Sequence, residues 1–204
     1  MQGPIGRLTL ALALASLVSA CVPAQQARDA QGAFFRGAKW GMSKAEVIKY
    51  EGRKPVLDRT ADGLETIAFE DEALGMRVQV VYSFQDGRLV RAGYAFMEEH
   101  GDNSRHIEDY NRIEAAVGKR WGPPTNSPVM IWSEGATPKE NGSWGAELGK
   151  GLLRFESLRE NADTEVLHSL ASTGAGIAHG LIYLNKAFER SRERDGSKGA
   201  SAKP

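Results

Sequence analysis

The densest group of side chains that could carry chemistry lies within residues 98–109. Imidazole nitrogens and carboxylate oxygens are both common metal ligands, and the stretch holds seven of them: Glu98, Glu99, His100, Asp102, His106, Glu108 and Asp109. The alternative interpretation is a solvated loop in which Asp102 or Ser104 caps a following helix, whose positive end favours acidic neighbours. We favour the loop, and expect no metal site, no catalytic residue and no cofactor.

Familiar catalytic motifs are missing elsewhere in the sequence. There is no glycine-rich phosphate loop, no Gly-x-Ser-x-Gly and no His-Glu-x-x-His. Gly174, Gly176 and Gly180 approach the spacing of a dinucleotide loop, but they lie between two expected strands, where no helix N-terminus would hold a phosphate. We interpret them as a hairpin turn. His168 and His179, in the same hairpin, are expected to be packed or surface side chains. A Ser-His-Asp arrangement of distant residues stays open.

The only cysteine, Cys21, follows a segment typical of exported proteins. Arg7 precedes an apolar run at residues 8–20, which ends in small residues and is too short to span a bilayer. The residues LVSAC resemble the lipobox of bacterial lipoproteins. This resemblance implies cleavage before Cys21 and acylation of that residue, and Val22 after it implies sorting to the outer membrane. The alternative is an ordinary secretory signal with a cysteine at the cleavage site by chance.

The composition is that of an ordinary folded protein of about one domain. The chain has 204 residues, with 26 basic and 26 acidic side chains and a formal net charge of zero. This balance argues against a nucleic-acid partner, because such proteins carry a basic excess. A single cysteine excludes a disulfide framework and a multi-cysteine metal site.

We expect four segments along the chain. Residues 1–20 are the lipoprotein signal peptide, and residues 21–32 form a polar, acylated tether. Residues 33–189 form a single α+β domain. Residues 190–204, with five basic and two acidic side chains and few apolar ones, form a disordered charged tail.

Two helices are predicted within the domain. Ser43 and Glu46 form a capping box, and Gly52 supplies a left-handed stop, so a helix is expected over residues 44–51. A second helix, over residues 104–119, has apolar side chains at near-helical spacing and is followed by Gly-Pro-Pro.

Alternating apolar residues and turn signals predict the strands. The expected strands cover residues 64–69, 76–84, 89–97, 129–133, 144–148, 152–158, 164–172 and 177–184. Asp86-Gly87 marks the turn between the second and third. A two-residue loop would pair Val80 with Gly93. A three-residue loop would pair Val80 with Ala92 and Tyr82 with Val90, keeping apolar residues on one face, and is the register we prefer.

The order of these elements predicts an α+β fold, with two helices packed on one face of an antiparallel sheet. A helix and about three strands are followed by another helix and four or five strands. The two halves begin at Ser43 and Ser104. A diverged duplication of one α-then-β unit is an open interpretation of this order.

The segment from Gly41 to Val47, with Gly52 and Pro55, resembles the first-helix signature of small outer-membrane-assembly lipoproteins. In that family a glycine, a Ser or Thr cap and a valine open a short helix. The family shares an α+β fold with a secreted β-lactamase inhibitor, so the resemblance implies that fold class here. This chain departs from the family by placing a β-hairpin between its helices.

Together these features predict a non-enzymatic, lipid-anchored protein of the bacterial envelope, at the outer membrane, that binds an envelope protein or has a structural role. The candidate partner surfaces are a face of the sheet and the loop at residues 135–142. Trp132 and Trp144 flank this loop and are the candidate partner-binding side chains. The alternative is a periplasmic hydrolase or metal-dependent enzyme that uses the region from His100 to Asp109. An inhibitor role would rest on fold analogy alone.

Replacing Cys21 by alanine should release the protein from membranes and leave the domain folded, because that sulfur carries the expected lipid. A single acyl chain binds a bilayer only marginally, at about 0.8 kcal/mol per buried methylene, whereas two or three chains bind persistently. Membrane fractionation after high-salt washing measures the effect. Recovery of the alanine variant in the membrane fraction would contradict the anchor.

Overall fold

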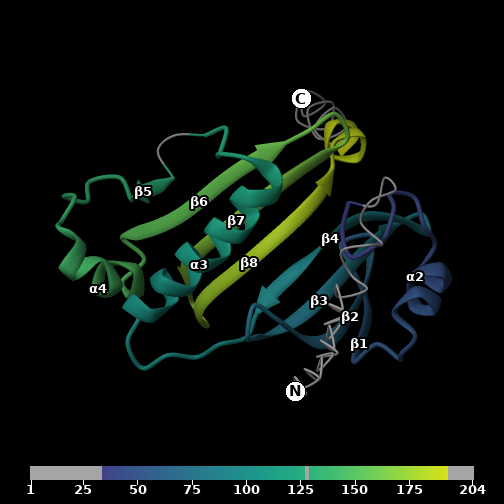
Figure 1. Cartoon of the computed structure of the whole chain (residues 1–204), viewed down its shortest axis with the longest axis horizontal. Helices are drawn as coiled ribbons and strands as arrows, with labels where there is room; N and C mark the ends of the chain where they lie inside the picture. Colours follow the sequence, from purple (N-terminus) through teal and green to yellow (C-terminus); the bar gives the residue numbers. More distant parts are fainter. Residues whose placement is uncertain (1–33, 127–128, 193–204) are drawn as a thin grey trace, which may run out of the picture.

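The computed structural model describes residues 34–126 and 129–192, in which eight strands form one antiparallel sheet (Figure 1). The strand order is β1-β2-β3-β4-β8-β7-β6-β5. The strands are β1 (Leu57–Ala61), β2 (Leu64–Ala73), β3 (Met76–Gln85), β4 (Arg88–Phe96), β5 (Met130–Trp132), β6 (Leu153–Glu160), β7 (Thr164–Thr173) and β8 (Gly176–Asn185). The helices are α2 (Lys44–Glu51), α3 (Ser104–Trp121), α4 (Trp144–Gly149) and the short 3-10 helix η1 (Asn141–Ser143). The predicted α+β fold class is confirmed.

The sheet consists of two halves in which the elements follow a similar order. Each half begins with a helix, α2 or α3, and continues with four strands, and the halves meet where β4 pairs with β8. Figure 1 shows α3 lying across β6, β7 and β8, while α2 lies beside the other half of the sheet. This order matches the repeated α-then-β unit considered from the sequence, with β1 as a strand that the sequence patterns missed.

One face of the sheet carries the main core. Directly paired residues of antiparallel strands point to the same face, so Tyr82, Ala92 and Tyr183 lie side by side across β3, β4 and β8. The segment that begins at Phe34, together with α2 and α3, covers this face. The buried residues of this core are Phe34, Phe35, Ala38, Val47, Ile67, Phe69, Met76, Val78, Val80, Tyr82, Phe84, Leu89, Ala92, Phe96, Ile113, Val117, Val166, Leu181 and Tyr183.

The first helix forms for the reason that its sequence indicates. The hydroxyl of Ser43 accepts from the backbone N–H of Glu46, whose carboxylate accepts from the backbone of Ser43. Gly52 ends the helix in the left-handed conformation, at φ 68°. The last helical residue, Glu51, then accepts a hydrogen bond of 2.6 Å from the hydroxyl of Tyr82 and pairs with Arg36. A glutamate on α2 therefore attaches both the helix and the N-terminal segment to the sheet.

The register predicted for the β3–β4 hairpin is wrong. The structure has the two-residue Asp86-Gly87 turn, with both residues at positive φ, and Gln85 opposite Arg88. A β-bulge follows, in which the partner of Ser83 is Arg91, so Val90 is the extra residue. Beyond the bulge Tyr82 pairs with Ala92. The turn sequence thus sets a two-residue loop. The bulge at Val90 then shifts the pairing by one residue, so that the apolar residues of both strands lie on the same face.

Two further expectations need correction. Residues 144–148 form part of α4 and not a strand. The spacing of Trp144 and Leu148 fits one face of either element, and the helix packs so closely on α3 that a Cβ on Gly145 would lie 2.6 Å from the backbone nitrogen of Ser104. The charged tail was expected from Arg190, but residues 186–192 are helical. The rest of the predicted tail, residues 193–204, lies outside the described residues, as do the predicted signal peptide and tether.

The contact between β4 and β8 depends on a residue without a side chain. A Cβ built on Gly93 would lie 2.4 Å from the carbonyl oxygen of Leu181. The same Cβ on Gly180, in the partner strand, would lie 3.6 Å from its nearest neighbour, which is ordinary contact. Gly93 therefore leaves no room for a side chain against β8, whereas Gly180 does.

Gly93→Ala should lower the free energy of unfolding by about 1–3 kcal/mol, the usual cost of overpacking. Gly180→Ala, the matched control, should be neutral or slightly stabilising, because alanine reduces the entropy of the unfolded chain. Urea denaturation of both variants measures the difference. Equal stability of the two would show that β4 and β8 can move apart without cost.

Candidate functional site

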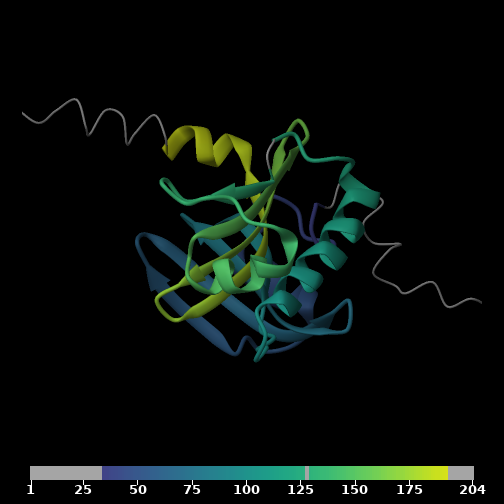
Figure 2. The same cartoon turned by 90° about the vertical axis from the view of Figure 1, so that its left-hand side faces the viewer.

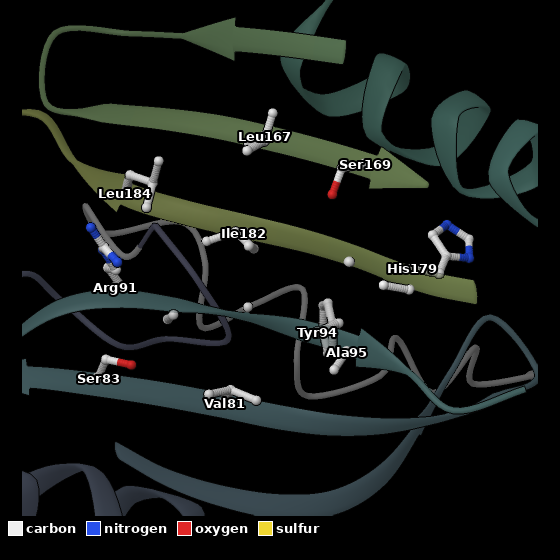
Figure 3. Close-up of a pocket in the computed structure, with 14 residues that line it drawn as sticks. Val81, Ser83, Arg91, Tyr94, Ala95, Leu167, Ser169, His179, Ile182 and Leu184 are labelled. Atoms are coloured by element: carbon white, nitrogen blue, oxygen red, sulfur yellow. The ribbon is translucent and has the colours of Figure 1, made fainter. Parts of the chain in front are cut away.

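The face of the sheet opposite α2 and α3 is open over its centre in the described part of the chain. Figure 3 shows its side chains along β3, β4, β8 and β7. They line a groove of about 590 Å³, and most are apolar or small: Val81, Ser83, Ala95, Leu167, Ser169, Ala178, Ile182 and Leu184. We call this surface the open sheet face.

An uncharged row crosses the open sheet face from one strand to the next. Paired residues share a face, so the sheet register aligns them across five strands: Val81, Gly93, Ile182, Leu167 and Leu158. Ala68 on β2, which pairs with Val81, is fully buried. Ile182, at the centre of the row, is 37% exposed, an unusual position for a large apolar side chain in a sheet interior. Its neighbours in the row, Val81 and Leu167, are half-buried.

A salt bridge marks one end of the groove. The guanidinium of Arg91 donates to both carboxylate oxygens of Glu189, at 2.7 and 2.9 Å. Glu189 belongs to the helix of residues 186–192, which Figure 2 shows in yellow on the side of the sheet away from α3. The charge of Arg91 is therefore already paired at the rim of the groove.

A network of ionisable side chains lies on the opposite face, between α3 and the second half of the sheet. Glu114 of α3 bonds to the hydroxyl of Ser157 and to Nδ1 of His168, both at 2.8 Å, and forms an ion pair with Arg159. His168 Nε2 lies 3.0 Å from His179 Nε2. Arg159 and His168 are 2% and 0% exposed. We call these five residues the buried network.

The hydrogen bonds of the buried network determine where its protons lie. A carboxylate only accepts, so Nδ1 of His168 must donate to Glu114. Neutral His168 then has a lone pair on Nε2, which requires Nε2 of His179 to be the donor. His179 is left with a free lone pair on Nδ1. The chain of bonds from Glu114 to His179 therefore has one consistent direction at neutral pH.

Aromatic rings enclose the two histidines. The ring of Tyr110, on α3, stacks on His168 with a centroid distance of 4.0 Å and an interplanar angle of 7°. Phe96 lies 4.7 Å from the ring of His179. Burial lowers the pKa of His179 to about 3, and burial also lowers the pKa of His168 against the opposing effect of Glu114. Both rings are therefore held neutral.

The pKa of Glu114 shifts by a balance of two effects. Burial alone would raise it, but hydrogen bonds from His168, Arg159 and Ser157 lower it to about 2. The carboxylate is ionised at neutral pH and offsets the charge of Arg159. The buried network accordingly contains one negative and one positive charge with two neutral imidazoles.

The N-cap residue of α3 is Asn103, not the predicted Asp102 or Ser104, and it makes no side-chain capping hydrogen bond. The carboxylate of Asp102 accepts from the backbone N–H of Ser104 at 3.0 Å. His100 Nε2 lies 2.7 Å from Asp109, and the rings of His100 and His106 are 4.6 Å apart. Within residues 34–126 and 129–192, no group of three or more His, Cys, Asp or Glu side chains is arranged to hold a metal.

The two tryptophans near residues 135–142 are half-buried. Both pack against a second cluster of buried residues, which consists of Ile107, Tyr110, Leu148, Leu153, Phe155 and Leu170. The indole N–H of Trp144 also donates to the carbonyl of Lys139. Cys21 lies outside the described residues. Across the described ranges, no helix is both long and apolar enough to cross a membrane.

The buried network is the feature that sequence reasoning missed. His168 alternates with the buried residues Val166 and Leu170 along β7, so its position on the inner face could have been read from the pattern. Glu114 lies one helical turn after Tyr110. The contact between Glu114 and His168 could not be predicted from the sequence, because it depends on where α3 packs on the sheet. Comparison with family models, curated proteins and solved structures found no match to this chain.

Glu114→Gln should lower the free energy of unfolding by about 2–4 kcal/mol, because it leaves the charge of Arg159 without a counter-ion. The matched control is Glu108→Gln, at an exposed position of the same helix, which should change it by less than about 0.5 kcal/mol. Chemical denaturation at pH 7.5 compares the two. If Glu114→Gln lowered the free energy of unfolding as little as Glu108→Gln does, the ion pair between Glu114 and Arg159 would not be stabilising.

Proposed function

We propose that this protein is a non-enzymatic lipoprotein of the bacterial envelope, anchored at the outer membrane, whose open sheet face binds a partner protein. The observation that carries the proposal is the uncharged row that leads through Val81, Gly93 and Ile182. A solvent-facing sheet normally alternates apolar and polar residues, and the polar side chains face the solvent. The solvent-facing residues at the centre of this sheet are small or apolar instead.

The chemistry of the open sheet face indicates the kind of partner. Its centre holds apolar and small side chains and two serines, Ser83 and Ser169, while the guanidinium of Arg91 is taken by Glu189. An apolar, uncharged segment of a partner would be buried there without leaving a charge unpaired. Since Trp132 and Trp144 are half-buried, the sheet face is the stronger candidate than the loop at residues 135–142.

The composition of the buried network supports a non-enzymatic role. A Ser-His pair needs the hydroxyl within hydrogen-bond reach of the imidazole. The hydroxyl of Ser157 bonds instead to Glu114 and Arg159, and the Nε2 atom of His168 faces His179. The network holds α3 on the sheet, and within the described residues it presents no activated nucleophile.

The lipobox supports the anchor, and the chain length fits it. Twelve residues lie between Cys21 and Phe34, the first described residue. A chain of that length reaches at most about 45 Å. The domain would therefore work close to the membrane surface, within reach of other membrane-anchored or membrane-embedded proteins.

Photo-crosslinking in intact cells tests the proposal. A photoreactive amino acid at position 182, at the centre of the open sheet face, should give one discrete protein adduct. The matched control is position 49, the exposed Lys49 on α2, which lies on the other side of the sheet and should give no such adduct. Combining the probe at position 182 with Leu167→Glu should abolish the adduct, because the added charge would be buried unpaired. Absence of an adduct at position 182, or the same adduct from both positions, would contradict docking on this face.

A further inference from the structure

All four histidines of the chain gather in one region, although the first and the last lie 79 positions apart in the sequence. His168 and His179 are hydrogen-bonded at 3.0 Å, and the rings of His100 and His106 are 4.6 Å apart. His106 also lies close enough to His179 to influence its charge. The partner binding proposed above makes no use of this arrangement.

We propose that His179, His168 and Glu114 form an acid-responsive latch, which holds α3 against the sheet at neutral pH and releases it when His179 takes up a proton. The latch does not depend on the proposed partner.

The hydrogen bonds allow the proton to enter without first breaking the chain. Nδ1 of His179 has the free lone pair, and a proton added there leaves the bond from His179 Nε2 to His168 intact. The Nε2 proton of His179 can then move to Nε2 of His168. His179 becomes neutral again with its proton on Nδ1, and His168 becomes an imidazolium that donates to both Glu114 and His179. One proton has entered, and the positive charge lies beside α3.

Within residues 34–126 and 129–192, the carboxylates that neighbour this imidazolium already have other partners. The carboxylate of Glu114, on α3, is already offset by the guanidinium of Arg159 from β6. The next carboxylate, Asp109 on α3, is engaged by His100 and by Arg112, at 2.7 Å each.

The remaining neighbours add no negative charge. They are Tyr110 and His106 on α3, Ser157 on β6 and Phe96 on β4. One carboxylate then faces two cations, and the net positive charge of the buried network favours the state in which the histidines reach water.

The element that must move is α3. Tyr110 and Glu114, one helical turn apart on α3, make the stacking contact and the hydrogen bond to His168. Charging the ring of His168 therefore disturbs the contacts between α3 and β7 directly. The first half of the sheet carries none of these groups apart from Phe96, so it should keep its structure.

The direction of the pH effect follows from the lowered pKa of the buried rings. In the released state the histidines have the ordinary pKa of 6.5, whereas in the closed state that of His179 is about 3. Between these values only the released state binds the proton, so falling pH shifts the balance towards release. At pH 5.0, 1.5 units below the ordinary pKa, His179 alone should increase the released fraction about 30-fold relative to pH 7.5.

Hydrogen exchange of the full-length chain in detergent tests the latch. After correction for intrinsic exchange rates, the amides of α3 should lose about 30-fold in protection between pH 7.5 and pH 5.0, while those of β2 and β3 should keep theirs. His179→Gln keeps a donor for His168 but does not titrate, so it should reduce the change to less than threefold. His100→Gln, at the partly exposed end of the cluster, is the matched control and should respond as the unmodified chain does.

Nitrogen-15 NMR of the unmodified chain at pH 7.5 gives an independent readout, which also serves if His179→Gln fails to fold. It should find the Nδ1–H tautomer for His168 and the Nε2–H tautomer for His179. The opposite tautomers would overturn the proposal. So would unchanged α3 protection, an unaltered response in His179→Gln, or simultaneous loss of protection in β2 and β3.

Discussion

The close approach of β4 and β8 is the constraint on which the rest of the structure depends. The strand pair joins two half-sheets, each of which would otherwise end in an exposed edge that invites pairing with other chains. Gly93 permits this approach, since a Cβ there would lie 2.4 Å from a carbonyl oxygen of β8. Because of this join, Tyr82 and Tyr183 share one buried face, and Val81 and Ile182 share the open one.

Each half attaches its helix to the sheet in a similar way, through a glutamate. Glu51 at the end of α2 accepts from Tyr82 and pairs with Arg36, and Glu114 on α3 bonds to Arg159 and His168. Buried ion pairs contribute little net stability, because desolvation offsets their attraction, but breaking one is costly. Such pairs make the position of a helix specific. In the second half the partner is a histidine, so the position of α3 also depends on pH.

Much of the fold could be predicted from local patterns. The capping box at Ser43 and the alternation along β3 involve neighbours in the sequence, and the structure has both elements. The β3–β4 register could not be predicted, because the turn at Asp86-Gly87 and the apolar alternation imply different pairings. The bulge at Val90 satisfies both. The segment at Trp144 was misassigned because residues four apart share a face in either a helix or a strand.

The buried network and the open sheet face could not be predicted from local sequence patterns, because both depend on contacts between distant parts of the chain. The buried network forms where α3 packs on β6, β7 and β8, and the open sheet face forms where β3, β4 and β8 pair. His168 reaches Glu114 across 54 residues, and Val81 joins the row of Ile182 only through β4. In the sequence alone, Ile182 reads as an ordinary strand residue, and its exposure becomes apparent only when the opposite face is seen to hold the core. The packing of α3 and the order of the strands therefore determine which side chains lie together, and they place a titratable network and an uncharged open face on the two sides of the same strands.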